Sequence, residues 1–337
     1  MGNQLGNQIA KSVCGERMFV DPDDKFEEKL DDQLLARAKY ISKRKRFYIA
    51  QHHKKLAKQA EAAGEVAKPT PAFRVLCLHS EGSRDDIFKW QMEDVMSSCA
   101  ARATKIGRGA PDFHFLTAPH LVPYPVDDVV KQRFAPAYYS WYLSTDPDYH
   151  KTIYDDSSYD GTNWTNAEWC YGRDCSVNMI AKAVCDEGPF DLIVGFGQGA
   201  ALAAYVANKY NWFDACVSFS SGHSCISRNA METLTLNEKC MYLHVHGEDD
   251  EMVAPRDGKK MERYFSDFHY HTVENMGYGV PTATFANSSS TPNAVSHIAS
   301  WLFWRFPAAD EPDGVIYANT DRLNHFDFAH DGTNAIG

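Results

Sequence analysis

Short apolar runs alternate with longer stretches of helical spacing through the middle of the chain. The apolar runs predict strands, and their ranges are 74–79, 112–116, 190–195, 215–220, 241–246 and 270–274. Helical spacing or a run of small residues predicts helices over 87–100, 200–209 and 297–306. Strands that alternate with helices favour an α/β fold, with a mostly parallel sheet covered on both faces.

Weaker patterns flank this alternation. Acidic residues at 23–24, basic residues further on and a thin apolar seam over 34–56 predict a helical N-terminal extension. Glycine and prolines then indicate a linker, and the end of the chain is polar without a clear period. We therefore expect three parts: an extension over 1–71, an α/β domain over 72–305 and a tail over 306–337.

Composition narrows the class of protein. The chain has 337 residues and is 44% hydrophobic, which allows one large core. It lacks an uninterrupted apolar run of about 18 residues and an apolar signal region, so we expect neither a membrane span nor secretion. Nine scattered cysteines are typical of reduced thiols in the cytoplasm, and three of them, Cys77, Cys216 and Cys240, should be inert and buried. The sequence indicates no cofactor.

Charge is distributed unevenly. The net charge is −11, yet the segment 33–58 holds nine basic residues and no acidic one. An acidic body with one basic arm argues against nucleic-acid binding and favours an acidic protein surface, such as a cytoskeletal, flagellar or other large assembly, or an anionic membrane. The candidate partner-binding residues are Arg37, Lys39, Lys43, Arg44, Lys45, Arg46, Lys54, Lys55 and Lys58.

The first residues resemble a myristoylation start. Gly2 follows Met1, although position 6 is a glycine where serine or threonine is favoured. Cys14 offers a site for a second acyl chain, and two signals are needed for stable anchoring. An ordinary tail without lipid remains the alternative.

The stretch 195–200, Gly-Phe-Gly-Gln-Gly-Ala, carries most of the chemical information. It follows a predicted strand and opens a predicted helix, which is where a G-x-S-x-G motif places a nucleophilic serine. The central residue here is Gly197. Glycine has no side chain that could attack a carbonyl, so covalent catalysis at this position is excluded.

Several blocks in the range 73–305 resemble the FSH-type family of serine hydrolases, within the α/β-hydrolase superfamily. They are RVLCLHSEGS, FLTAPH, YYSWY, GPFDLIVGFGQGAALAA, HVHGEDDEMV and GYGVP. The resemblance implies an elbow reading Gly-Phe-Ser-Gln-Gly-Ala, with Gly197 in the place of the nucleophile. It also makes Asp250 the acid of the triad, puts Tyr278 where the base histidine belongs, and puts Ser80 where the first loop carries a glycine.

These departures predict a non-catalytic member of the family, a pseudoenzyme that acts as a structural or interaction subunit. Tyrosine, with a reference pKa of about 10, is a poor general base at neutral pH. A remnant pocket lined by Gly197, Asp250 and Tyr278 could hold a small ligand. The alternative is a weak carboxylesterase that uses a non-standard nucleophile.

Other sites remain open. Gly195, Gly197 and Ala200 match the dinucleotide fingerprint, but no acidic residue closes the next strand. Ser220, Ser221 and His223 could form a relocated hydrolase site, although a plain turn is the simpler interpretation. A metal could bind the alternating pair His244 and His246, or the cysteines at 170 and 175, but core histidines and isolated thiols fit these patterns better.

Overall fold

The fold is that of a computed structural model, which describes residues 30–43, 71–122, 125, 127–143, 172–222, 233–283 and 294–306, with 55, 58–59 and 62 as isolated positions. Gly2, Cys14, Arg44, Lys45, Arg46, Lys54, Cys170, His223 and the tail from 307 onward lie outside the described residues. Within the described ranges, every helix falls short of the length and apolar character that a bilayer crossing requires.

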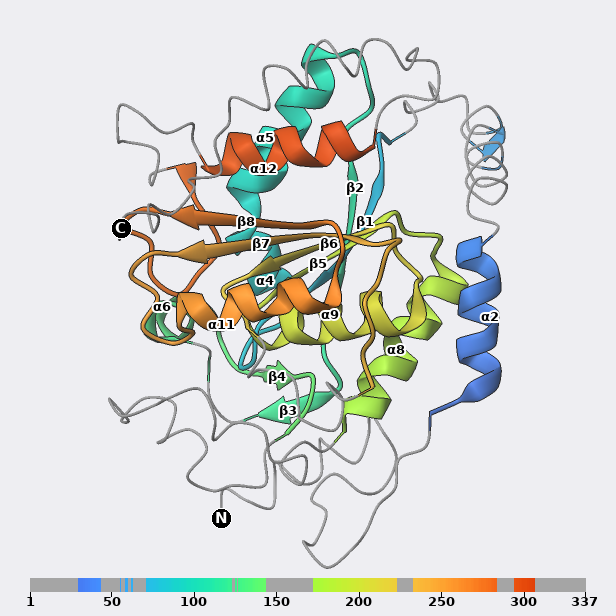
Figure 1. The fold of residues 1–337 in the computed structure, drawn as a ribbon, viewed down its shortest axis with the longest axis horizontal. Helices are drawn as coiled ribbons and strands as arrows, with labels where there is room; N and C mark the ends of the chain where they lie inside the picture. Colours follow the sequence, from blue (N-terminus) through green and yellow to red (C-terminus); the bar gives the residue numbers. More distant parts are fainter. Residues whose placement is uncertain are drawn as a thin grey trace, which may run out of the picture.

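A six-stranded sheet forms the centre of the molecule (Figure 1), and all its neighbouring strands are parallel. The strand order is β2-β1-β5-β6-β7-β8. The sheet comprises β1 (Arg74–Leu78), β2 (Asp112–Leu116), β5 (Leu192–Phe196), β6 (Ala215–Phe219), β7 (Met241–Gly247) and β8 (Phe268–Val273). Every residue of β1, β5, β6 and β7 is buried, as expected for strands that are covered on both faces.

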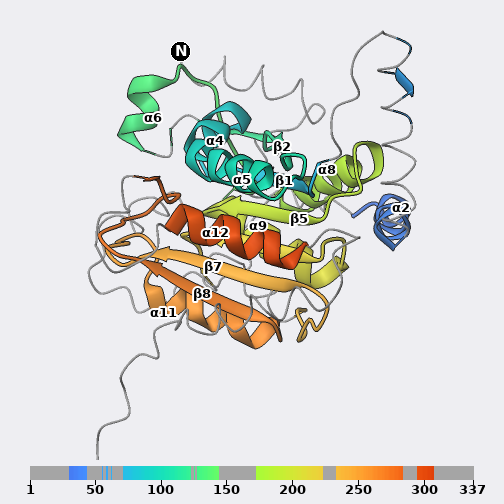
Figure 2. The same ribbon diagram turned by 90° about the horizontal axis from the view of Figure 1, so that it is seen from above.

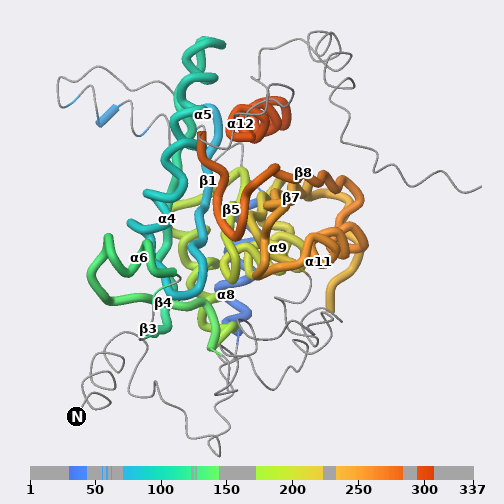
Figure 3. The backbone as a smooth tube through the Cα atoms, turned by 90° about the vertical axis from the view of Figure 1, so that its left-hand side faces the viewer, coloured from blue at the N-terminus to red at the C-terminus, as the bar shows by residue number. Residues whose placement is uncertain are grey.

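Helices form a layer on each face of the sheet (Figure 1), and Figure 2 looks down onto one of these layers. One layer holds α4 (Asp85–Gln91), α5 (Glu93–Lys105) and α12 (Ala294–Arg305), and α12 lies beside α5 (Figure 3). The opposite layer holds α8 (Arg173–Asp186), α9 (Gln198–Tyr210) and α11 (Pro255–Lys259), followed by the 3-10 helix η4 (Lys260–Tyr264). Two hydrophobic clusters, one on each face, fill the space between helices and sheet.

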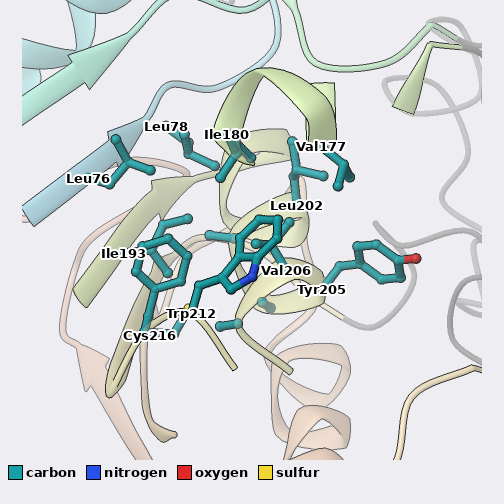
Figure 4. Close-up of a cluster of buried hydrophobic side chains, with 14 of the residues drawn as sticks. Leu76, Leu78, Val177, Ile180, Ile193, Leu202, Tyr205, Val206, Trp212 and Cys216 are labelled. Carbon is teal, nitrogen blue, oxygen red and sulfur yellow. The ribbon is translucent and has the colours of Figure 1, made fainter. Parts of the chain in front are cut away.

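One of these clusters lies between the sheet and helices α8 and α9 (Figure 4). Leu76, Leu78 and Ile193 project from the sheet onto Ile180 of α8 and onto the side chain of Trp212. All five are at most 2% exposed. At roughly 1.5–3 kcal/mol for each large apolar side chain, this packing holds β5 and α9 in a fixed relation, and the loop between them is fixed as a result.

The N-terminal extension contributes one helix to this layer, α2 (Asp32–Lys43), which packs against α8 (Figures 1 and 2). Ala38 and Ile41 are buried there, and both leucines of its first turns pack on the same hydrophobic cluster. Asn178 Oδ1 accepts a hydrogen bond of 3.0 Å from the backbone N–H of Asp31. The part of the predicted apolar seam that lies in described residues, Leu34, Ala38 and Ile41, thus packs within the chain.

The predicted strands are all present, with ends that differ by one or two residues. The single helix predicted over 87–100 is wrong: the chain turns at Met92, which separates α4 from α5. The closing helix begins at Ala294, earlier than predicted. The sequence patterns missed α8, α6 (Asp128–Arg133) and the antiparallel pair β3 (His120–Val122) and β4 (Tyr138–Ser140).

Candidate functional site: a glycine turn flanked by two hydroxyls

Gly197 forms the turn between β5 and α9, with φ 53° and ψ −116°. A positive φ is strained for any residue with a side chain, which is the usual backbone of a nucleophile elbow. Gly195 and Gly199, on either side of this turn, must lack a side chain because neighbouring backbone atoms come close to them. A Cβ on Gly195 would lie 2.5 Å from the Ala200 backbone, and a Cβ on Gly199 would lie 2.2 Å from the carbonyl oxygen of His79.

The space that a side chain at position 197 would need is already filled. A Cβ on Gly197 would lie 2.0 Å from Tyr278 Oη and 2.4 Å from Ser80 Oγ. These two hydroxyls are hydrogen-bonded to each other at 2.8 Å. The elbow therefore still has two hydroxyl groups at its tip, but both come from neighbouring loops.

Gln198 fixes the first turn of α9 against the segment that follows β4. Its Oε1 accepts a 2.6 Å hydrogen bond from the backbone N–H of Trp141, and its Nε2 donates to the carbonyl oxygen of Tyr142 at 2.9 Å. The Trp141 indole N–H donates to the carbonyl oxygen of His79 at 2.8 Å. One tryptophan thus connects the first loop of the sheet to the elbow.

His79 does not serve as a substitute base. Its Nε2 accepts a hydrogen bond from the Ala118 N–H at 2.9 Å, and its Nδ1 lies 2.6 Å from the carbonyl oxygen of Ser80, so both ring nitrogens are occupied. Burial lowers the pKa of His79 to about 4, although the bond to Ser80 raises it in part. The ring is neutral at physiological pH and acts as a structural link.

Asp250 lies in the loop after β7 and is 7% exposed. Its Oδ1 accepts hydrogen bonds of 2.9 Å from the N–H groups of Met252 and Val253, and Oδ2 is buried. Burial raises the pKa of this carboxyl, and the bonds to Val253, the Ser220 hydroxyl and Met252 act in the opposite direction.

Ser220 holds the loop that carries Tyr278. Its hydroxyl donates to the carbonyl oxygen of Gly279 and accepts from the Gly279 N–H, both at 3.1 Å. Ser220 itself has a positive φ of 42° at the end of β6. Tyr278 is also fixed by its ring, whose centroid lies 4.8 Å from that of Phe196.

Comparison with known proteins identifies this arrangement. The family model described as serine hydrolase (FSH1) matches residues 69–284, well over half of the chain. The chain belongs to the FSH1 serine hydrolase family. Its parallel sheet, flanking helices and strand–elbow–helix unit are those of an α/β hydrolase. The matched range contains β1 to β8 and every residue of the elbow site.

Curated relatives match the chain at low identity. The rhodanese-like domain-containing protein 6 of Arabidopsis thaliana is 27% identical over 234 residues, which are 62% of this chain but 36% of that protein. A Caenorhabditis elegans protein named as an esterase is 24% identical over 219 residues, 63% of this chain and 88% of that one. The chain thus spans about a third of the first relative and most of the second.

Solved structures give more distant matches. The crystal structure of Arabidopsis thaliana SOBER1 is 16% identical, with a TM-score of 0.41 over 70% of this chain and 99% of that one. The Bacillus cereus carboxylesterase is 14% identical, with a TM-score of 0.42 over 72% of this chain and 91% of that one.

Of the three positions that the resemblance assigns to a triad, two meet in the structure. Gly197 and Tyr278 are in contact at the elbow, and Asp250 lies buried in its own loop after β7. The remnant pocket expected between these residues is filled at its elbow end by the Tyr278 and Ser80 hydroxyls. Sequence reasoning treated Ser80 as a defect of the first loop and missed that its hydroxyl reaches the nucleophile position.

The structure distinguishes the alternatives that the sequence left open for the histidine pair and for the cysteines. His244 and His246 are fully buried core histidines, as predicted, and their rings stack on Tyr270. Burial lowers the pKa of His244 to about 3 and that of His246 to about 4, so both are neutral. Among the described residues, no three His, Cys, Asp or Glu side chains form a metal-binding group. Three thiols predicted to be inert are buried: Cys77, Cys216 and Cys240.

Five of the nine basic candidates in the arm lie in described positions, and all five are exposed: Arg37, Lys39, Lys43, Lys55 and Lys58. Arg37 Nη2 lies 3.9 Å from Asp186 Oδ1 on α8. An exposed ion pair of this length contributes little stability, so the basic side chains of α2 remain available to solvent.

Proposed function

We propose that this FSH1 family member is non-catalytic and acts as a structural or interaction subunit. The observation that carries the proposal is the glycine at the elbow, with the missing side chain's space taken by the Tyr278 phenol. A nucleophile and its base must act together, since removal of either partner of such a unit removes most of the rate.

Reactivation tests this proposal. Esterase activity would be measured on short-chain p-nitrophenyl esters for the natural protein, for G197S with Y278H, and for the triple variant that adds S80G. The third change is needed because Ser80 Oγ also overlaps a side chain at 197. We expect no esterase activity from the natural protein and measurable esterase activity from the triple variant.

A further substitution, D250N, serves as the control for the restored triad. It should lower the activity of the triple variant by about 10⁴-fold, because the acid orients and stabilises the histidine. Sustained turnover by the natural protein at neutral pH would overturn the non-catalytic proposal.

A second candidate function, weak carboxylesterase activity, is favoured by one observation. The Ser80 hydroxyl lies beside the position of the missing nucleophile and is bonded to Tyr278. Several relatives are named esterases, which makes ester hydrolysis the ancestral activity to look for. Turnover that survives D250N but is lost in S80A would establish this candidate in place of the first.

The interaction role rests on the basic arm. The exposed cations of α2 and of positions 55 and 58 offer a positive surface to an acidic protein assembly or an anionic membrane. Because Ala38 and Ile41 anchor α2 to the body, deletion of the arm would disturb packing as well as charge. Reversal of exposed charges, with K39E, K43E, K55E and K58E combined, isolates the electrostatic effect.

We expect the charge-reversed protein to fold and to lose its localisation in the cell. A matched variant that mutates the same positions to arginine keeps the charge and should localise normally. Correct localisation of the charge-reversed protein would refute the role of the arm. The acyl groups proposed at Gly2 and Cys14 are tested separately, by mass spectrometry of the protein isolated from its own cells.

A further inference from the structure

A second group of cations lies on the helix layer that carries α2. Helices α11 and η4 together span 255–264, and three of their basic side chains are exposed: Arg256, Lys259 and Arg263. The fourth, Lys260, lies 3.2 Å from the buried carboxylate of Asp257, and Glu262 is the exposed acidic residue of this segment. The local excess of positive charge stands out, because the chain outside 33–58 is strongly acidic.

The two cation groups share one face of the central sheet. Ala38 of α2, Met261 of η4 and Phe265, which follows η4, belong to the same hydrophobic cluster as α8 and α9. Figure 1 shows these helices as one layer, with α2 at one end and α11 at the other. A single partner that contacts both groups must therefore carry negative charge across the width of this layer.

Each cation group also has an exposed apolar side chain beside it. Tyr40 lies among the exposed cations of α2 and is 48% exposed. Leu236 is 54% exposed and directly precedes Asn237, whose backbone N–H donates a 2.9 Å hydrogen bond to the Tyr264 carbonyl oxygen at the end of η4. Apolar side chains among cations are typical of surfaces that bind at the headgroup level of a bilayer.

We infer that this helix layer docks on an anionic lipid bilayer, with α2 and the segment 255–264 as its two points of contact. The inference rests on the proposed interaction role of the basic arm and names the surface that the arm binds. A bilayer offers negative charge over the whole layer, and it buries Tyr40 and Leu236 as well. The attraction falls off within about 8 Å at physiological salt, so acidic side chains on the far side of the body do not cancel it.

The test measures sedimentation of the full-length protein with two kinds of vesicle, phosphatidylcholine alone and equal parts of phosphatidylcholine and phosphatidylserine. We expect binding to the anionic vesicles, and loss of this binding at high salt. The combined variant Arg256→Glu, Lys259→Glu and Arg263→Glu should lower the partition at least about a hundredfold, because each cation near the surface contributes about fivefold.

A matched variant on the opposite layer separates position from net charge. Lys89→Glu, Arg102→Glu and Lys105→Glu change three exposed cations of α4 and α5, whose buried side chains pack on the other hydrophobic cluster. This variant has the same net charge as the first and should bind anionic vesicles like the natural protein. Equal losses in the two variants would overturn the inference, since the layer would then have no preferred side.

The apolar contact distinguishes a bilayer from an acidic protein. Leu236→Ala should weaken vesicle binding about tenfold at every salt concentration that allows binding, because burial of an apolar side chain is not screened. Ile106→Ala is the control, since Ile106 is 42% exposed and follows α5 in the opposite layer.

Two further results would overturn the inference while leaving the proposed function intact. One is a natural protein that ignores anionic vesicles although reversal of the α2 charges still abolishes localisation, which would identify an acidic protein assembly as the partner. The other is vesicle binding that depends on α2 but is unchanged by charge reversal in 255–264. Circular dichroism of each variant verifies that it is folded.

Discussion

Substitution of Gly197 by alanine measures how completely the elbow is filled. The left-handed backbone at φ 53° costs a residue with a Cβ about 1–2 kcal/mol. The overlaps of 2.0 Å with Tyr278 Oη and 2.4 Å with Ser80 Oγ add about 1–3 kcal/mol, the usual cost of overpacking. We therefore expect Gly197→Ala to lower the free energy of unfolding by about 2–5 kcal/mol.

A mutant cycle separates the two contributions. In Tyr278→Phe the nearest atom of residue 278 becomes the ring carbon, 3.1 Å from the new Cβ, and adding Ser80→Ala removes the second overlap. The cost of Gly197→Ala should then fall to its backbone part. The decrease relative to the natural background is the coupling free energy, which we expect to be about 1–3 kcal/mol. Gly107→Ala is the control for that part, because its φ is 69° and nothing lies within 4 Å of the added Cβ.

The assay is urea unfolding at 25 °C, followed by tryptophan fluorescence and circular dichroism. An equal cost of Gly197→Ala in all three backgrounds would refute the argument that hydroxyls occupy the elbow. A cost equal to that of Gly107→Ala in the natural background would refute it as well.

Three further predictions concern the surrounding structure. The free energy of unfolding should fall as the pH drops from 6.5 towards 4, by about 1.4 kcal/mol per pH unit for each buried neutral histidine, because the unfolded state binds protons that the folded state excludes. Urea unfolding midpoints between pH 5 and 7.5 measure this effect, and a midpoint that does not change with pH would contradict it. The histidines whose pKa burial lowers to about 4 or below are His79, His244, His246 and His271. Gln198→Ala should cost about 2–4 kcal/mol in urea unfolding, since it strands the buried N–H of Trp141 and the carbonyl of Tyr142. Ala38→Glu should detach α2 and increase hydrogen exchange in α8, whereas exposed Ala36→Glu should leave it unchanged; equal exchange in both would argue against docking.

The sheet was predictable because its strands are short apolar runs. β1, β5, β6 and β7 are buried on both faces, and a strand of this kind shows in the sequence without any knowledge of its neighbours. Helix α8 was missed because polar and small residues interrupt its apolar face, and its burial depends on the packing of α2 and the sheet against it. Three-residue strands such as β3 and β4 leave too little pattern to detect.

The candidate site was predictable in part. The elbow could be located because Gly195 and Gly199 are required by close backbone contacts, and these requirements are visible as sequence spacing. The meeting of Ser80 with Tyr278 was not predictable, since these residues are 198 positions apart and touch only through the arrangement of two loops. The clamp between Ser220 and Gly279 depends on tertiary structure in the same way.

The docking of α2 has a mechanical consequence. α2 packs on α8, and α8 packs on the central sheet, so helix α2 of the extension is joined to the core of the molecule. If the arm is bound to a fixed support, a pull on the body is transmitted through the α2–α8 contact rather than through a loose tether. The force at which Ala38 and Ile41 slide out of this contact would then set the strength of the attachment.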